Sequence, residues 1–451
     1  MTTTSAPGAP GVTGVPAPAL TGRTLRFSGN LLLAVAAGIA LQIWLVALIG
    51  GLGAHALYLR SLYAPVGFVS LAITEGLAIT VQVCAGIAAR NGTARDYAAS
   101  LLTLTGIGLA AFAALAAGLA TLSGPIEDAL GVPAGSRQDL GAFLTLMTVS
   151  AGVALIPAVC EAGLRGLGRT RASAVLAVGH VVAVAVTVGL LVKVGHTGVY
   201  GVPLGYLAAT VPFVVATAVT LDRAGIGVLR RSHWHWRASA LPWLGRIALP
   251  VGASLLLLST AASGYLALLH GAPATEVSGF GLGQIVQGYL VVPATVLGSG
   301  AALAANLSPA ADRRQVVTAG LRALLVIAGP VYLLLAAGVF AGGPTIVDGL
   351  TGSAAVRSVG ADYLTTVAPT LCLLGPSVAV LGYLEQVGRA TIALLLNAGL
   401  FGATLLAAAL LPGPAGSLDL ARVIAVANTA GFAVVLLTAL IVLRRPEEVT
   451  P

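Results

Sequence analysis

The sequence predicts an all-α protein with twelve transmembrane helices arranged as two lobes of six. Three observations predict this fold class: a composition poor in charge, a series of long apolar runs, and a weak repeat between the two halves. Of the 451 residues, 57% are apolar and 8% are charged, whereas roughly 25% of the residues of a soluble domain are charged. So few charges cannot cover a soluble body of this size. The composition therefore excludes a soluble enzyme, a disordered chain and a nucleic-acid binder, in spite of the net charge of +8.

Long apolar runs follow one another from Gly29 onward, and each can supply the roughly 20 apolar residues that a membrane-spanning helix needs. The runs are too long and too continuous for the short alternating strands of a membrane β-barrel. We expect spans at residues 29–51, 57–89, 98–122, 138–160, 171–194, 198–221, 243–269, 276–305, 316–341, 357–384, 389–411 and 418–443.

The segments outside these spans complete the predicted domain organisation. Residues 1–22 are rich in Pro, Gly, Thr and Ala, and we expect a disordered tail without the pattern of a cleavable signal peptide. The N-lobe is then residues 23–221, the C-lobe residues 243–443, and the C-terminal tail residues 444–451. Between the lobes, residues 222–242 form a cytoplasmic linker whose Trp and Arg residues suggest a segment lying on lipid headgroups.

The basic residues predict how the chain is oriented in the membrane. If the N-terminus is cytoplasmic, the inside segments hold 18 of the 23 basic residues and the outside segments hold five. This asymmetry follows the positive-inside rule, so we expect both termini in the cytoplasm. The outside residues are Arg60, Arg137, Lys193, Arg357 and Arg422. The large excess of Arg over Lys is typical of a GC-rich genome, and we expect a multi-pass protein of a bacterial cytoplasmic (inner) membrane.

The two halves of the chain repeat weakly. A shift of 224 residues places Gly76 on Gly300 and Gln82 on Asn306, and a shift of 220 places Gly168-Arg169 on Gly388-Arg389. Because six spans precede the repeat, both copies have the same orientation and are related by an axis along the membrane normal. Two such lobes around a central cavity are an architecture of transporters, with the substrate near the membrane midplane.

Four stretches resemble motifs of the multidrug and toxic compound extrusion (MATE) transporters. They are AGIAARNGTARDYAAS (85–100), LRGLGRTRAS (164–173), GHTGVYGVPLGYLAAT (195–210) and LGRIALPVGASL (244–255). The resemblance implies a V-shaped exporter of the multidrug/oligosaccharidyl-lipid/polysaccharide flippase superfamily. Such exporters alternate access and couple export to the entry of protons or sodium ions.

The carboxylates on which this family commonly relies are absent from the matching positions. Leu45 holds the place of the acid in span 1, and no acid follows Pro250 in span 7. The stretch YLTTVAPTLCLLGPS (363–377) lacks the acid of span 10. The family's ion-coupling residues therefore cannot be carried over to this chain.

Two titratable residues inside the spans are candidates for ion coupling. Glu75 is the only acid deep within a span, and it shares a helical face with Gln82. It could bind a proton or cation or balance a cationic substrate, or it could hydrogen-bond another helix for packing. His180 is the only mid-span histidine. It could relay protons or donate a hydrogen bond to a backbone carbonyl.

Polar and aromatic residues in the spans are candidates for substrate binding. Gln284 and Gln287 lie on one face of span 8 with Thr295, Ser299 and Asn306. This face could line a water-filled cavity or bond another helix. The remaining candidates are Gln42, Trp44, Gln82, Tyr265, Tyr289 and Asn397, of which the aromatic residues would suit planar or cationic molecules.

The sequence shows no zinc-protease, Walker A or Rossmann motif, and its three Cys match no metal-ligand spacing. We therefore expect no enzyme, and no cofactor or metal beyond a coupling proton or sodium ion. The expected function is the secondary active export of small amphipathic or cationic organic compounds, such as drugs or natural products, by a monomer in a lipid bilayer. A lipid-linked precursor flippase of the same superfamily is the alternative, against which the lack of mid-span basic residues argues. A membrane enzyme on this scaffold is a third hypothesis.

Overall fold

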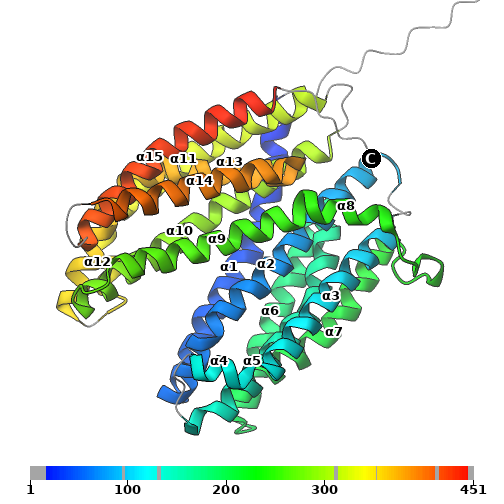
Figure 1. Ribbon diagram of the computed structural model, residues 1–451. Helices are drawn as coiled ribbons and strands as arrows, with labels where there is room; N and C mark the ends of the chain where they lie inside the picture. Colours follow the sequence, from blue (N-terminus) through cyan, green and yellow to red (C-terminus); the bar gives the residue numbers. More distant parts are fainter. Residues whose placement is uncertain are drawn as a thin grey trace, which may run out of the picture.

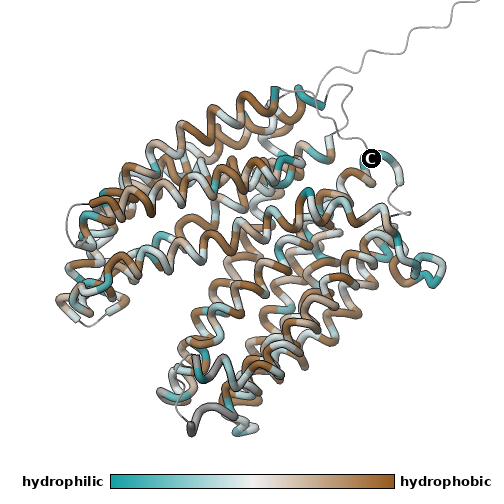
Figure 2. The backbone as a smooth tube through the Cα atoms, in the orientation of Figure 1, coloured by the Kyte–Doolittle hydropathy of each residue, from teal (hydrophilic) through white to brown (hydrophobic). Residues whose placement is uncertain are grey.

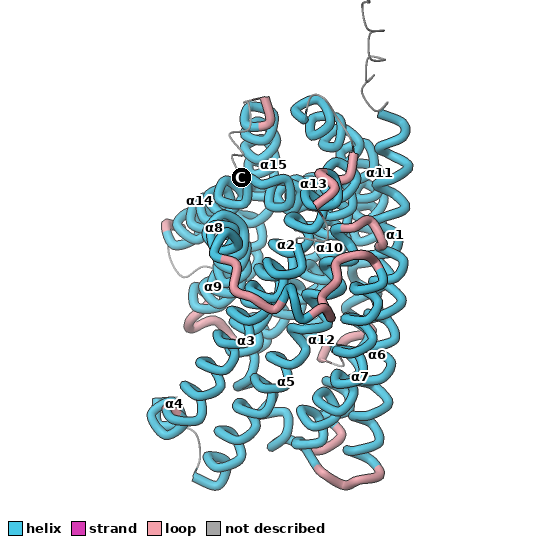
Figure 3. Tube along the Cα trace, turned by 90° about the vertical axis from the view of Figure 1, so that its right-hand side faces the viewer, coloured by secondary structure: helices cyan, strands magenta, loops and turns pink. Residues whose placement is uncertain are grey.

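The computed structural model describes residues 17–93, 97–129, 134–308, 313–351, 353–411 and 416–444, and helices make up nearly all of them (Figure 1). Within these ranges there is no β-strand, and short loops join the helices (Figure 3). The first half of the chain forms α1 (Ala17–Gly50), α2 (Ala54–Arg90), α3 (Tyr97–Thr121), a short α4 (Ser123–Ala129), α5 (Ala134–Gly166), α6 (Thr170–Lys193) and α7 (Gly201–Arg223).

The second half begins with the single turn α8 (Leu241–Trp243), which continues through a π-helical turn, η4 (Leu244–Ala248), into α9 (Leu249–Leu268). The helices that follow are α10 (Ala274–Asn306), α11 (Arg313–Asp348), α12 (Ala354–Val367), α13 (Leu371–Leu384), α14 (Ala390–Ala409) and α15 (Ser417–Val442). A second π-helical turn, η6 (Glu385–Arg389), separates α13 from α14.

Eleven stretches of the described chain are long and apolar enough to cross a membrane, and one of them contains two crossings. That stretch, Ala354–Ala409, has 56 residues. As one straight helix it would be about 84 Å long, against a hydrocarbon core of about 30 Å. Its direction changes at Gly388, whose φ of 94° is not helical. The fold therefore has the twelve spans expected from the sequence.

The start of α1 corrects one expectation. Residues 17–22, placed by their composition in the disordered tail, are helical. Leu20 is fully buried and packs with Leu303 and Ala304 of α10. Tertiary packing thus stabilises a helical segment that composition alone does not favour. The rest of the expected tails, residues 1–16 and 445–451, lies outside the described residues.

The helices form two bundles, α1–α7 and α9–α15, which meet at one end and diverge at the other (Figure 1). Both ends of the described chain and the α7–α8 connection lie at the end where the bundles meet, here called the closed end. Apolar residues cover the length of the helices, and hydrophilic ones gather near their ends (Figure 2). Leu334 and Leu410, for example, are 74% and 73% exposed, as expected of surfaces that face lipid. The protein is therefore a multi-pass membrane protein.

The first helix of each bundle also packs against the other bundle. α1 lies along α10 and α11, and α9 lies along α2. Gly300 of α10 has no room for a Cβ because Ser28 of α1 occupies that space, and Gly76 of α2 is blocked in the same way by the carbonyl of Ala248. These two glycines are partners in the sequence repeat. The repeat is thus confirmed as a pair of equivalent helix crossings.

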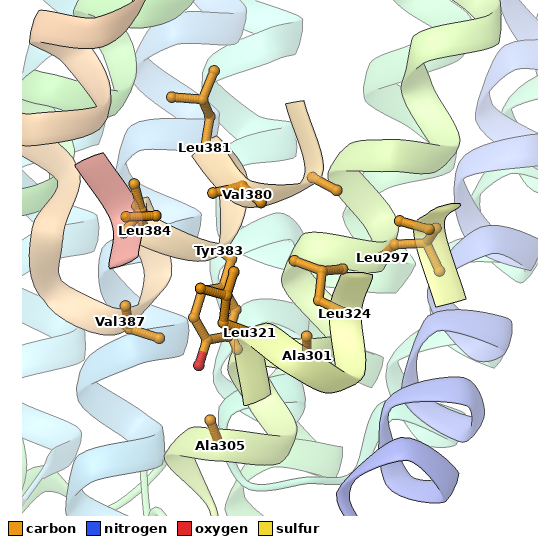
Figure 4. Close-up of a cluster of buried hydrophobic side chains, with 14 of the residues drawn as sticks. Leu297, Ala301, Ala305, Leu321, Leu324, Val380, Leu381, Tyr383, Leu384 and Val387 are labelled. Atoms are coloured by element: carbon orange, nitrogen blue, oxygen red, sulfur yellow. The ribbon is translucent and has the colours of Figure 1, made fainter. Parts of the chain in front are cut away.

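Each bundle has its own apolar core. In the C-lobe, Leu297 and Ala301 of α10 pack against Leu324 of α11 and Val380 of α13 (Figure 4). A separate cluster in the N-lobe joins α2, α3 and α5 through residues such as Leu77, Leu104 and Leu155. Each lobe thus has a large core of its own, and two smaller apolar clusters join α1 to α10 and α2 to η4 across the lobes.

Candidate functional site

A chain of buried amide hydrogen bonds joins the two lobes near the closed end. Gln82 of α2, which is 4% exposed, donates from Nε2 to Oε1 of Gln386 in η6 at 2.6 Å. Oε1 of Gln82 accepts from Nε of Arg165 at 2.8 Å, and Nε2 of Gln386 donates to Oγ of Ser299 at 2.5 Å. The Gln82–Gln386 bond thus connects α5 and α2 of the N-lobe to η6 and α10 of the C-lobe.

The same chain of contacts extends into each lobe. Nδ2 of Asn306 donates to the carbonyl of Gln386 at 2.9 Å, and the Oδ1 of Asn306 accepts from Arg313. On the other side, Nη1 of Arg165 donates to Oγ of Ser173 at 3.4 Å. We call the set Gln82, Arg165, Ser299, Asn306 and Gln386 the interlobe network.

Glycines at the helix ends make this network possible. Gly168 and Gly388 have φ values of 78° and 94°, in the left-handed region that favours glycine. Gly168 turns the chain just after α5 and Gly388 turns it within η6, so that Arg165 and Gln386 lie next to these turns and beside α2. Gly166 lies against the backbone of Gln82 with no room for a Cβ. The repeat that aligned Gly168 with Gly388 is therefore confirmed at this junction also.

Carboxyl groups from both lobes surround the network. Glu75 lies seven residues, or two turns, before Gln82 on α2, within electrostatic range of Arg165 in its own lobe and Glu385 in the other. Arg165 also interacts with Glu161, which is 7% exposed. Arg165 is thus within electrostatic range of two carboxyls of its own lobe, and Glu75 is also within range of Glu385 of the C-lobe.

Several predicted site residues lie inside the N-lobe, away from this network. Gln42 donates from Nε2 to Oη of Tyr206 at 3.5 Å and accepts from Arg60 at 3.4 Å. The Nε2 of His180 is 3.0 Å from Oγ1 of Thr210, and its ring stacks on that of Phe213 with centroids 5.1 Å apart. A further N-lobe candidate, Trp44, packs beside Gly189 of α6.

The remaining candidates lie in the C-lobe. Oε1 of Gln287 accepts a hydrogen bond from the hydroxyl of Tyr363. Tyr265 is buried in the apolar cluster that also holds Tyr363. The exposed fractions of the others are larger: Gln284 and Asn397 are half-buried, and Tyr289 is 43% exposed. The structure thus does not bring the sequence-predicted residues into one bonded group: Gln82 belongs to the interlobe network, whereas Gln42, His180 and Gln287 have other partners.

Sequence reasoning identified Gln82 but missed its partner Gln386. It also missed Tyr206 and Tyr363, which bond Gln42 and Gln287. A signal was present for Gln386 alone, because this amide precedes by two residues the glycine that the repeat had marked. Within the described residues there is no group of three or more His, Cys, Asp or Glu side chains that could hold a metal ion.

No protein-family model matches this sequence, and no curated protein is detectably similar to it. Solved structures, in contrast, match almost the whole chain. The Vibrio cholerae MATE transporter VcmN in its bent form has a TM-score of 0.86 at 19% identity, over 95% of this chain and 98% of that one. A multidrug-resistance MATE transporter in an outward-facing conformation has a TM-score of 0.81 at 15% identity, over 95% and 99%.

A third match is a Pyrococcus furiosus transporter of the multidrug/oligosaccharidyl-lipid/polysaccharide flippase superfamily, with a TM-score of 0.82 at 14% identity over 95% of this chain and 99% of that one. The fold is therefore that of a two-lobed membrane transporter. More particularly, the chain has the MATE fold, and the fold expected from the motif resemblance is confirmed.

Proposed function

We propose that this chain is a secondary active transporter that exports small amphipathic or cationic organic compounds by alternating access. The observation that supports this function best is the interlobe network. It joins two lobes with separate cores at one end, through the hydrogen bond between Gln82 and Gln386. At the other end the lobes diverge (Figure 1).

The hydrogen bond that crosses between the lobes joins two neutral amides, those of Gln82 and Gln386, and can break reversibly. A hydrogen bond inside a protein contributes only about 0.5–1.5 kcal/mol net, because water replaces the partner when the bond breaks. Substrate or ion binding that favours the other state by a few kcal/mol could therefore shift the equilibrium.

The positive-inside rule supports a cytoplasmic position for the closed end. The N-terminus of α1 lies at this end, as does the α7–α8 connection with the exposed Arg230 and Arg231. Both termini are then cytoplasmic, and the diverging end faces the outside of the cell. In this orientation the structure corresponds to a state open to the outside.

We propose Glu75 as the coupling residue, with a proton or sodium ion as the coupling ion. Arg165, its electrostatic partner, also donates to Gln82. Protonation or cation binding at Glu75 would weaken its attraction for Arg165 and so change the support of the Gln82–Gln386 bond. Ion binding and opening of the closed end are thereby linked through one guanidinium.

The test is transport of a fluorescent organic cation in proteoliposomes under an imposed pH or sodium gradient. We expect Glu75→Gln to abolish gradient-driven transport while the protein keeps its elution profile and melting temperature. Asp362→Asn, which removes an exposed acid from α12, is the matched control and should transport normally. Unchanged transport and pH response of Glu75→Gln would contradict the role of Glu75, and a lack of gradient-driven transport by the parent would contradict the proposed function.

A further inference from the structure

The connection between α7 and α8, residues 224–240, is a folded surface at the closed end (Figure 1). Ile226, Val228 and Ala240 are at most 4% exposed and belong to the N-lobe core. The backbone N–H of Arg237 donates to Oγ1 of Thr103 in α3 at 3.0 Å. These contacts fix the backbone of the connection to the N-lobe.

Two indole rings project from this connection. Trp234 and Trp236 are 66% and 62% exposed. Nε1 of Trp234 donates to the carbonyl of Val228 at 2.9 Å, so the polar atom of this ring is satisfied within the protein. An exposed apolar ring suits the boundary between lipid headgroups and acyl chains, where tryptophan is enriched.

Arg residues lie close to these rings in the sequence. The only acid in residues 222–242 accepts a hydrogen bond within this segment. Arg230 and Arg231 are exposed and precede Trp234 by four and three residues. Asp222, the one acid in residues 222–242, accepts from the backbone N–H of Leu229 at 3.1 Å. Figure 2 shows that much of the α7–α8 connection is hydrophilic. The surface therefore combines positive charge with apolar rings.

We propose that Arg230, Arg231, Trp234 and Trp236 form a binding site for the headgroup of an anionic phospholipid of the cytoplasmic leaflet. Guanidinium groups bind phosphate through paired hydrogen bonds, while the indole rings enter the boundary of the acyl chains. Clusters of Arg next to a membrane span are attracted to the negative surface of this leaflet. The proposal depends on the closed end being cytoplasmic, and it is independent of substrate and coupling ion.

The chain offers a direct test, because it has only four Trp. Trp44→Phe with Trp243→Phe leaves the two rings of the connection as the only fluorescent indoles. The full-length protein is measured in nanodiscs that contain dibrominated phosphatidylglycerol or dibrominated phosphatidylcholine, since bromine quenches tryptophan on contact. We expect at least twofold stronger quenching by the anionic lipid, and a smaller difference at high salt because ions screen the attraction.

In the same background, Arg230→Gln with Arg231→Gln should abolish the difference between the two lipids. Arg169→Gln with Arg171→Gln removes the same charge from two exposed positions at the α5–α6 junction, and the difference should persist. Elution profile and melting temperature establish that each variant is folded.

Three results would overturn the proposal. Equal quenching by both lipids would mean contact with the membrane without headgroup recognition. Absence of quenching by either lipid would mean an aqueous surface, suited to a soluble partner. Displacement of the anionic lipid by free glycerophosphate would mean a site for phosphate itself.

Discussion

At the scale of single residues, the buried amides of the interlobe network differ from the exposed polar side chains of the spans. Gln82 and Gln386 are 4% and 3% exposed and bond at 2.6 Å. Gln42 is exposed, and its two bonds are 3.5 and 3.4 Å long. A buried amide that loses its partner cannot turn to water, whereas an exposed one can.

We therefore predict that Gln82→Leu lowers the free energy of unfolding by about 1–3 kcal/mol, because Arg165 and Gln386 lose a buried partner. The melting temperature in detergent measures this change. Gln42→Leu is the matched control and should shift stability by less than about 0.5 kcal/mol. Equal melting temperatures for Gln82→Leu and the parent would show that the interlobe network contributes no stability.

The residues of the site could be predicted only in part, because some of them are not conspicuous in the sequence. Glu75 and Gln82 could be identified because a polar residue within an apolar run is conspicuous in one helix. Their partners Arg165 and Gln386 lie at helix ends, where polar residues are common. Only the packing of four helices, which the sequence does not display, makes these two residues part of the network.

At the scale of helices, close crossings depend on glycines that the repeat had already paired. Gly300 of α10 touches Ser28 of α1, and Gly76 of α2 touches the carbonyl of Ala248. The sequence could predict that these positions are equivalent, because the shift of 224 residues aligns them. It could not predict which helix approaches them, since that contact is made across the lobes.

We predict that Gly300→Ala destabilises the protein by about 1–3 kcal/mol, because the added methyl group must push α1 away from α10. Thermal unfolding followed by circular dichroism measures the effect. The control lies on the same helix: nothing is within 4 Å of a Cβ added at Gly288. Gly288→Ala should be neutral or slightly stabilising, because Ala is the better helix former, and an equal loss in both variants would mean that the close approach of Ser28 is not responsible.

At the scale of the whole molecule, two sequence patterns were enough to predict the fold. The length of each apolar run predicted a membrane span. The distribution of Arg predicted which ends of the spans lie on the same side of the membrane. The start of α1 at Ala17 escaped prediction because it depends on Leu20 packing against α10. The division between α13 and α14 lies between two spans predicted from the apolar runs, 357–384 and 389–411, and its Gly388 is the repeat counterpart of Gly168.

The proposed alternating access requires the closed end to open in each transport cycle. In a background with Cys84, Cys160 and Cys372 replaced by Ala, Gln82→Cys with Gln386→Cys places one thiol on each lobe where the amides meet at 2.6 Å. A short, reducible bis-thiosulfonate linker should then stop transport in proteoliposomes, and a reducing agent should restore it. Ser299→Cys with Gln386→Cys is the matched control, because these side chains meet at 2.5 Å within the C-lobe. Transport should continue when this pair is linked. If the Gln82–Gln386 pair is fully linked and transport continues, the closed end does not open, and alternating access between these lobes is wrong.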